Sequence, residues 1–530
     1  MMFSPSRNLL RSFASVALFT VALAGTAQAQ SDQTTDVVTQ LNKQFYGDIA
    51  ANKRSDTLLL PALAKMASPP AAVAKIERAG LVPAGSADWA AAEAWAKGET
   101  QQNVLKVLAT ITAEPDWRKA FGFGQPYGTD GVSIELIKAG LYTELGDPPT
   151  LAAANHRFLP KFDELVCLVN VEATRLTAEG KASDAIDLLT NLAYFGRQMC
   201  DRQFYDEAAW GLSTIAQACE RIRDVAYTDF TGEKKIEIDR VVPQIKRLEM
   251  PEKYLDLNRM KFPQGDKAGT RQIVDRVYEN KGKVKQNVFG PTMAKLGSSK
   301  RPLRLFSEAA FWMRQAESQG DWFDVSPKAD GVYSDFERRW KLDYFDKAQG
   351  NVTTLAKLTP GKAAAVTQSS PTLEKLVGYR QIAKTEIAGT RQTLALVAFA
   401  IRNGVFAPQI SSVRPLWMEV IEDDPFNADR ADSKRPAFEY FVPIRDHKKR
   451  NPREEDKPHE MEIVTQTGAN FGVTLRQDTF VLYSTGSDYV KNQARRIQNT
   501  NDKIENGDYL IYPPIMSLYR KHLQDRQELK

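Results

Sequence analysis

Three consecutive segments of the chain repeat apolar residues at three- and four-residue spacing, and links of only a few residues separate them. Such spacing predicts amphipathic helices, and short links place neighbouring helices antiparallel. Gly180-Lys181-Ala182 forms the first link, and Ser183 is expected to cap the second helix. We therefore predict a helical-hairpin region over residues 30–260, with its clearest helices at 156–179, 183–200 and 205–226.

The first residues read as an export signal. Arg7 and Arg11 precede an apolar run from Phe13 to Ala24, and Ala27-Gln28-Ala29 has the small-x-small pattern of a cleavage site. An anchoring helix needs ~20 apolar residues, and this run is shorter. We predict a signal peptide at residues 1–29, a periplasmic or secreted protein, and no transmembrane anchor after cleavage.

Export places the cysteines in an oxidising compartment. The chain has three of them, Cys167, Cys200 and Cys219, without a Cys-x-x-Cys pair, so a thiol oxidoreductase or zinc ribbon has no support. Buried free thiols are one expectation. The other is a disulfide between Cys167 and Cys200, since antiparallel helices that rise ~1.5 Å per residue would place these two at similar heights.

Charge and composition limit the partners. Lys and Arg total 71 and Asp and Glu total 66, a net charge of +5, which is too weakly basic for a nucleic-acid-binding surface. Within 262–305, basic residues cluster among Gly and Ser. A solvated linker explains this cluster, and a patch for an anionic polymer is the alternative. We predict a basic linker and an aromatic-rich helical region over 261–370, the basic residues being Lys281, Lys283, Lys285, Lys295, Lys300, Arg301 and Arg304.

The last part of the chain has a different organisation. A long helical pattern runs from about Thr372 to Arg402 and stops at Asn403-Gly404, where glycine suits a left-handed cap. Runs rich in aromatic and β-branched residues then predict strands. One helix followed by antiparallel strands is an α+β pattern, which we assign to residues 371–530. The expected strands are 438–442, 462–465, 471–475, 480–483 and 509–512.

Several motifs of this α+β part resemble the soluble domain of the type II secretion major pseudopilin. Arg402-Asn403-Gly404 resembles the end of the family's helix, and Asp424-Pro425-Phe426-Asn427 resembles its Asp-Pro-Trp-Gly motif. Ser484-Thr485-Gly486-Ser487-Asp488 and Gly507-Asp508-Tyr509 resemble its last turn and closing strand. Large secreted planctomycete-type bacterial proteins have similar tails. The resemblance implies a long helix packed on a small antiparallel sheet.

The same resemblance implies a calcium site. In the family, carboxylates and backbone carbonyls of the loop between the last strands bind calcium, which takes six to eight oxygen ligands. Asp488 and Asp508 match the acidic positions, Leu482 and Ser484 fall where carbonyl ligands occur, and Asp502 is a further acid in the loop. The alternative is a solvated hairpin loop with capping aspartates.

No motif in the sequence names a reaction. The four histidines, His156, His447, His459 and His522, have no metal-site spacing, and Gly-x-Ser-x-Gly is absent. Our first hypothesis is an exported, non-enzymatic binding or scaffold protein with a protein partner. A second is a hydrolase of envelope or extracellular polymers, and a third is an accessory component of a type II secretion system. The hydrolase would use carboxylates near Trp322 and Trp340, namely Asp321, Asp324, Asp335 and Glu337.

Overall fold

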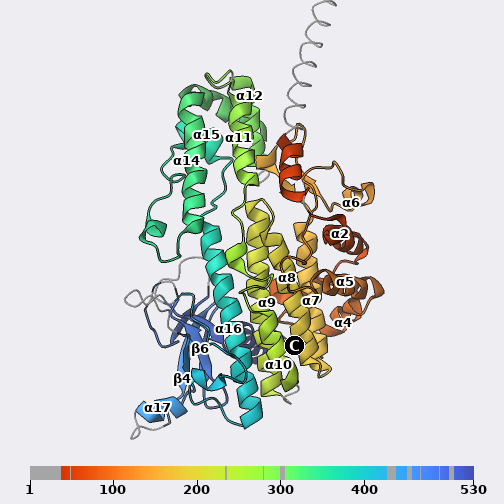
Figure 1. Cartoon of the computed structure of the whole chain (residues 1–530), viewed down its shortest axis with the longest axis vertical. Helices are drawn as coiled ribbons and strands as arrows, with labels where there is room; N and C mark the ends of the chain where they lie inside the picture. The colour runs from red at the N-terminus through yellow and green to blue at the C-terminus, as the bar shows by residue number, and fades with distance from the viewer. Residues whose placement is uncertain are drawn as a thin grey trace, which may run out of the picture.

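The protein is described by a computed structural model that covers residues 37–47, 49–232, 236–278, 280–298, 305–426, 437–450, 456–465, 467–486, 488, 490–499 and 507–529. The predicted signal segment at 1–29 and the loop residue Asp502 lie outside these ranges. Figure 1 shows a central group of long helices, with shorter N-terminal helices on one side and a small β region on the other.

The central helices form the predicted hairpins. They are α7 (Leu159–Ala178), α8 (Ala182–Cys200) and α9 (Tyr205–Thr231), which confirms the helices expected in this part of the chain. Gly180 turns the chain between α7 and α8 with φ +78°. The prediction that Ser183 caps α8 is wrong. Lys181 is the N-cap residue, and the Ser183 hydroxyl instead accepts a hydrogen bond from the Glu237 amide at 3.2 Å.

Two glycines let α8 and α9 approach closely. A Cβ atom on Gly211 would lie 2.5 Å from the carbonyl oxygen of Gly196 and 2.9 Å from the Cys200 amide nitrogen. Both obstacles belong to the backbone of α8, so neither could move aside as a side chain could. These positions therefore set the distance between the two helices.

The N-terminal layer is built from short helices that cover α7 and α8. Proline and glycine interrupt its sequence, which explains the short lengths. A helix at residues 37–46 precedes it, and α3 and α4 pack on α7 while α5 packs on α8. The elements are α2 (Asp56–Lys65), α3 (Ile76–Ala79), α4 (Trp89–Ala96), α5 (Glu99–Ile111), α6 (Ile134–Lys138), β1 (Thr143–Glu144) and β2 (Asn155–His156).

Most of the stretch expected to be a basic linker is helical. Apolar residues such as Ile273, Val277, Phe289 and Met293 are buried, and their spacing gives two helices an inner face. Lys281, Lys283 and Lys285 lie between these helices. The helices of this part, drawn in green in Figure 1, are α11 (Gly265–Val277), α12 (Gln286–Ser298), α13 (Leu305–Gln315), α14 (Trp322–Lys341) and α15 (Pro360–Thr367), and α10 (Ile238–Arg247) precedes them.

The long helix α16 (Lys375–Asn403) joins the helical region to the β region (Figure 1). It packs along α9 on one side, and β6 and β8 contact it on another. Gly404 ends it in the left-handed conformation with φ +69°, as the sequence predicts. Gly389 allows close contact with β8, because a Cβ there would lie 2.7 Å from Ile511 Cγ2.

Two three-stranded sheets follow α16. The first has the order β3-β6-β8 and is antiparallel, and the second has the order β5-β4-β7 with β4 parallel to β7. Every residue of β6 and β8 is buried, because one face packs towards α16 and the other towards the second sheet. The bounds are β3 (Glu439–Phe441), β4 (His459–Val464), β5 (Asn470–Leu475), β6 (Val481–Ser484), β7 (Arg496–Gln498) and β8 (Tyr509–Tyr512), with α17 (Arg445–Arg450) after β3.

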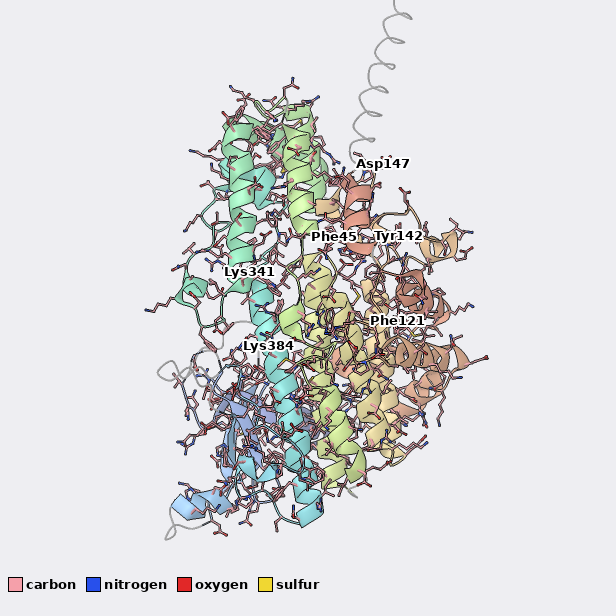
Figure 2. The ribbon with its side chains drawn as sticks, in the orientation of Figure 1. Phe45, Phe121, Tyr142, Asp147, Lys341 and Lys384 are labelled. Atoms are coloured by element: carbon pink, nitrogen blue, oxygen red, sulfur yellow. The ribbon has the colours of Figure 1, made fainter. Side chains whose placement is uncertain are left out.

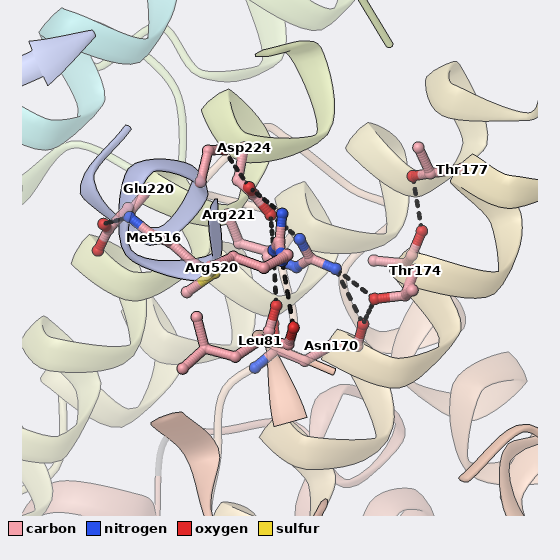
Figure 3. Close-up of polar contacts among 12 residues, drawn as sticks. Leu81, Asn170, Thr174, Thr177, Glu220, Arg221, Asp224, Met516 and Arg520 are labelled. Carbon is pink, nitrogen blue, oxygen red and sulfur yellow. Dashed lines mark hydrogen bonds and ion pairs between the residues drawn. The ribbon is translucent and has the colours of Figure 1, made fainter. Parts of the chain in front are cut away.

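The final helix, α18 (Ile515–Asp525), returns the chain to the N-terminal helices. Arg520 Nη2 donates to Asp224 Oδ2 on α9 and to the Gly80 carbonyl, both at 2.7 Å (Figure 3). Arg221 also pairs with Asp224, which is fully buried. This cluster ties together three parts of the chain that are distant in sequence, since a buried charge needs such partners.

One hydrophobic core spans most of the molecule. It extends from Leu59 on α2 to Tyr512 on β8, so residues on both sides of the predicted boundary at 370/371 share it. The coarse expectation of a mainly helical region with a small antiparallel sheet is thus met. Seven short 3-10 helices complete the described elements: Ala51–Lys53, Ala71–Val73, Leu151–Ala153, Leu257–Arg259, Ala316–Ser318, Lys347–Gly350 and Ile410–Val413.

Candidate functional site: a cationic groove between α14 and α16

A groove of about 830 Å³ lies where the C-terminal end of α14 meets the first turns of α16. The segment 258–264 forms its third wall, and Phe45 of the N-terminal helix reaches its rim. Figure 2 labels three lining residues: Lys341 at the end of α14, Lys384 further along α16, and Phe45 on the opposite side. This volume lies within the range of ~300–1,000 Å³ typical of small-molecule sites.

Arg380 and Trp340 form the centre of the groove. The guanidinium carbon of Arg380 lies 3.7 Å from the centroid of the Trp340 ring, and Arg380 Nη2 donates to the Trp340 carbonyl at 2.8 Å. Trp340 is itself fixed, because its indole nitrogen donates to the Met260 carbonyl at 3.2 Å and its ring packs on Phe262. The tryptophan therefore holds the guanidinium plane in one orientation.

No carboxylate of the described residues forms an ion pair with Arg380. Burial is the cause that lowers the pKa of Arg380 to about 10, since the half-buried charge has lost part of its hydration. A guanidinium at this pKa is still charged at neutral pH. The groove thus contains a partly desolvated cation whose one hydrogen bond within the described residues goes to the Trp340 carbonyl.

The charges around Arg380 are mostly positive. Among the described lining residues, four are cationic and two are acidic: Lys261, Lys341, Arg380 and Lys384 against Glu337 and Asp343. Lys267 lies 3.0 Å from Glu337 Oε1, so one of the two acids is already paired. The groove therefore attracts anions, and a planar guanidinium matches two oxygens of a carboxylate or phosphate.

The groove also contacts the β region. Gln381 donates its side-chain amide to the Pro425 carbonyl, and the ring of Tyr344 packs on Phe426 with centroids 5.5 Å apart. Asp424 accepts a hydrogen bond from the Phe426 amide at 2.9 Å and holds this turn in shape. The Asp-Pro-Phe motif singled out in the sequence therefore supports one wall of the groove.

The four acids proposed for a hydrolase do not converge. Asp321 caps α14, and Asp324 pairs with Lys328. Asp335 is buried, which by itself would raise its pKa, but Arg338 and Arg339 contact it and the net effect is a lowered pKa. Asp321, the N-cap of α14, and Glu337 are sixteen residues apart, a helical rise of about 24 Å, whereas a glycosidase pair needs about 5–9.5 Å. Glu337 is the member of this set that lines the groove.

The predicted calcium residues are only partly brought together. The two oxygens of Asp508 accept hydrogen bonds from the amides of Asn492 and Ala494, at 3.2 and 2.7 Å. Burial, together with the nearby charges of Asp488 and Glu439, raises the pKa of Asp508 to about 6. Asp488 Oδ2 is buried without a hydrogen-bond partner. Leu482 and Ser484 lie in β6.

Within the described part of the chain, no group of three or more His, Cys, Asp or Glu side chains has an arrangement suited to a metal ion. The described residues therefore give no cluster of carboxylates in support of calcium, and calcium binding by this loop stays a prediction. The described histidines have structural neighbours: His156 is buried beside Glu207, His459 lies 3.2 Å from the Ala494 carbonyl, and His522 stacks on Phe471.

The three cysteines are buried free thiols, and the considered Cys167–Cys200 disulfide is not formed. Their surroundings explain why. Cys167 on α7 lies near Glu77 of α3, Cys200 contacts Gly211 on α9, and Cys219 is close to Thr390 on α16. Burial raises the pKa of each thiol to about 12, so they are poor nucleophiles.

A second hollow of about 930 Å³ lies in the β region, between β3 and the β4–β5 pair. Among its described lining residues, four are acidic and two are basic: Glu439, Asp446, Glu460 and Glu462 against Lys457 and Arg495. Glu439 is paired with Lys491 and Asp446 with Arg445, which leaves two acidic and two basic lining residues and no clear preference for a ligand class. The groove at Arg380 is therefore the stronger candidate.

Sequence reasoning did not find this groove. Lys261, Lys341 and Arg380 are far apart along the chain, and none belongs to a recognisable motif. Trp340 was noted, but as part of an aromatic stretch and not as a platform for an arginine. Helical spacing alone could have placed Arg380 and Lys384 on one face of α16, since they are four residues apart.

No family model, curated protein or solved structure matches this chain. In the residues that the structure covers, no helix combines the length and apolar character required to cross a bilayer.

Proposed function

We propose that this protein is an exported binding protein whose ligand site is the groove between α14 and α16. The observation that carries this proposal is the half-buried guanidinium of Arg380, held over Trp340 without a carboxylate partner among the described residues. Leaving a cation partly desolvated costs stability, and such a cost is typical of a functional site. Export rests on the sequence of residues 1–29.

The scaffold part of the proposal rests on how the groove is built. Its walls come from α14, α16 and the 258–264 segment, and the β region supports it through Phe426. We further propose that the C-terminal part shares the pseudopilin architecture, supported by α16 and the antiparallel β3-β6-β8 sheet. In this proposal the β region positions the groove and offers a surface to a protein partner.

Fragment binding tests the proposal. Ligand-observed NMR would compare the full chain with Asn258→Trp, which adds an indole at an exposed lining position. Asn351→Trp, an exposed residue that does not line the groove, is the matched control. We expect fragments whose binding is lost in Asn258→Trp and kept in Asn351→Trp. If no fragment of any charge depends on position 258, the groove is not a binding site.

A further inference from the structure

The groove at Arg380 has a chemical preference that goes beyond a general binding role. We propose that it binds a small organic or inorganic molecule with two or more negative charges, carried on carboxylate or phosphate groups, with Arg380 as the central contact. This inference rests on the proposed binding function, and it names the class of ligand that the site accepts.

The geometry of Arg380 favours a ligand group that offers two acceptor oxygens. One Nη atom is engaged with the Trp340 carbonyl, and the stacked ring fixes the guanidinium plane. No described residue accepts a hydrogen bond from Nε or Nη1 of Arg380. Nη2 also has a second N–H, and together with the neighbouring N–H of Nε or of Nη1 it forms a parallel pair of donors that matches the paired oxygens of a carboxylate or phosphate. A charge-assisted pair of this kind is stronger than a neutral hydrogen bond.

The surrounding lysines favour more than one negative charge. Lys261 and Lys341 are exposed at the rim, one from each of two walls of the groove. Glu337 is neutralised by Lys267, which leaves Asp343 as the other acid among the described lining residues. A monoanion would satisfy Arg380 but leave the rim lysines without a counter-charge. A compact dianion or trianion would reach both.

The groove's other lining groups suit a small polar molecule. The side chains of Asn258, Gln203 and Gln264 line it beside the cations. Amides donate and accept hydrogen bonds, so they can contact the hydroxyl or ester oxygens that accompany carboxylates and phosphates in small metabolites. A nucleic acid would need a longer basic track with exposed aromatic faces. Here the Trp340 ring is buried, with Arg380 stacked on it and Phe262 packed against it.

Isothermal titration of the full chain tests this inference with three probes. Pyrophosphate represents phosphates, tricarballylate represents carboxylates, and glycerol is the uncharged comparison. We expect at least one anion to bind, glycerol not to bind, and affinity to fall as salt rises from about 0.05 to 0.5 M, since screening weakens contacts between charges. The anion that binds more tightly shows whether the ligand carries its charge on phosphate or on carboxylate groups.

Three variants locate the binding. Arg380→Gln should weaken the anion about tenfold or more, and Lys341→Gln about two- to fivefold, whereas Lys375→Gln should leave affinity unchanged. Lys375 is an exposed lysine of the same helix that does not line the groove. Lys341 is also exposed, so its variant tests the inference even if Arg380→Gln folds poorly.

Three results would overturn the inference, and they are distinguishable. If neutral or cationic fragments bind in a way that depends on Asn258 and neither anion does, the anion preference is wrong while the binding function stands. If an anion binds equally well to Arg380→Gln and Lys341→Gln, the site lies elsewhere. Absence of any binding that depends on Asn258 would remove the proposed function as well.

Discussion

The guanidinium of Arg223 on α9 lies 2.6 Å from the carboxylate of Glu386 on α16, and both side chains are almost completely buried. Tyr509 on β8 donates its hydroxyl to the other oxygen of Glu386 at 2.6 Å. The pair therefore joins the hairpin helices, the long helix and the sheet at one point. Its position fixes how α16 sits, and with it the wall of the groove that carries Arg380.

Removing one member of this buried pair should destabilise the protein strongly. Arg223→Met leaves the Glu386 charge buried without its cation, and we expect the free energy of unfolding to fall by about 3–5 kcal/mol. Urea denaturation followed by circular dichroism measures the loss. Arg402→Met replaces an exposed arginine at the end of α16 and should change stability little. A loss in Arg223→Met no larger than in this control would contradict the role of the pair.

Gly211→Ala tests the close approach of α8 and α9. The new methyl group would lie 2.5 Å from the Gly196 carbonyl oxygen, so the helices must separate, and overpacking of this kind costs about 1–3 kcal/mol. Gly361→Ala is the control, because a Cβ there meets nothing within 4 Å. Thermal unfolding should show a lower Tm for Gly211→Ala alone. Equal Tm values for both variants would mean that the contact is not tight.

Asp424 makes stability depend on pH. Burial raises the pKa of its carboxyl from an ordinary value near 3.8 to about 7. Between these values the folded protein holds a proton that the unfolded chain releases, so stability falls as pH rises through this window and levels off above it. An asparagine at this position does not titrate, so the stability of Asp424→Asn does not fall in this window for this reason.

The measurement is the difference in Tm between Asp424→Asn and the wild type. The Tm of Asp424→Asn relative to that of the wild type should rise from pH 4 to about pH 7 and stay constant above pH 8. Asp423→Asn, at the neighbouring position, serves as the control. A difference for Asp424→Asn that does not change with pH would show that the carboxyl is ionised in the folded state across the whole range.

The calcium prediction is tested on the full chain. If the loop near Asp488 binds calcium, the ion at ~100 times its dissociation constant should stabilise the protein by ~2.7 kcal/mol relative to chelator. Asp488→Asn should abolish this shift without unfolding the protein, because within the described residues the Asp488 side chain accepts one hydrogen bond, from the Val490 amide. Magnesium at equal concentration should have a smaller effect. If calcium does not change the stability, the result favours the alternative of a solvated hairpin loop with capping aspartates.

Local sequence patterns predicted much of the helical fold. Helices α7, α8 and α16 and the cap at Gly404 follow from periodicity and glycine placement. The sequence of 262–305 predicts a linker, because its lysines and glycines outweigh a modest apolar face. Only the packed structure shows that Phe289 and Met293 are buried there.

The strands were predicted where apolar runs were continuous and missed where they were short. β6 and β8 are buried on both faces, so their sequences are apolar throughout and easily recognised. β7 contains a single buried residue, Ile497, between Arg496 and Gln498. Its own sequence therefore gives little indication of a strand, and the strand is evident only from its pairing with β4. Tertiary pairing of this kind is not visible in a short window of sequence.

The groove was beyond local patterns for a similar reason. Its contacts join residues near 260, 340 and 380, and each of these stretches is ordinary when read alone. The informative feature is the stacking of Arg380 on Trp340, forty residues earlier in the chain. A cation without an ion partner can be recognised only when its neighbours are known.

Hydrogen exchange of the full chain, with and without pyrophosphate or tricarballylate at saturating concentration, tests the central claim most directly. The account predicts slower amide exchange in the segments 258–264 and 342–344, which line the groove outside regular α-helix, and no change in the β4–β5 hairpin. Arg380→Gln should remove this protection. Protection confined to the hairpin or to other surfaces, or none at all, would contradict the assignment of the groove as an anion-binding site.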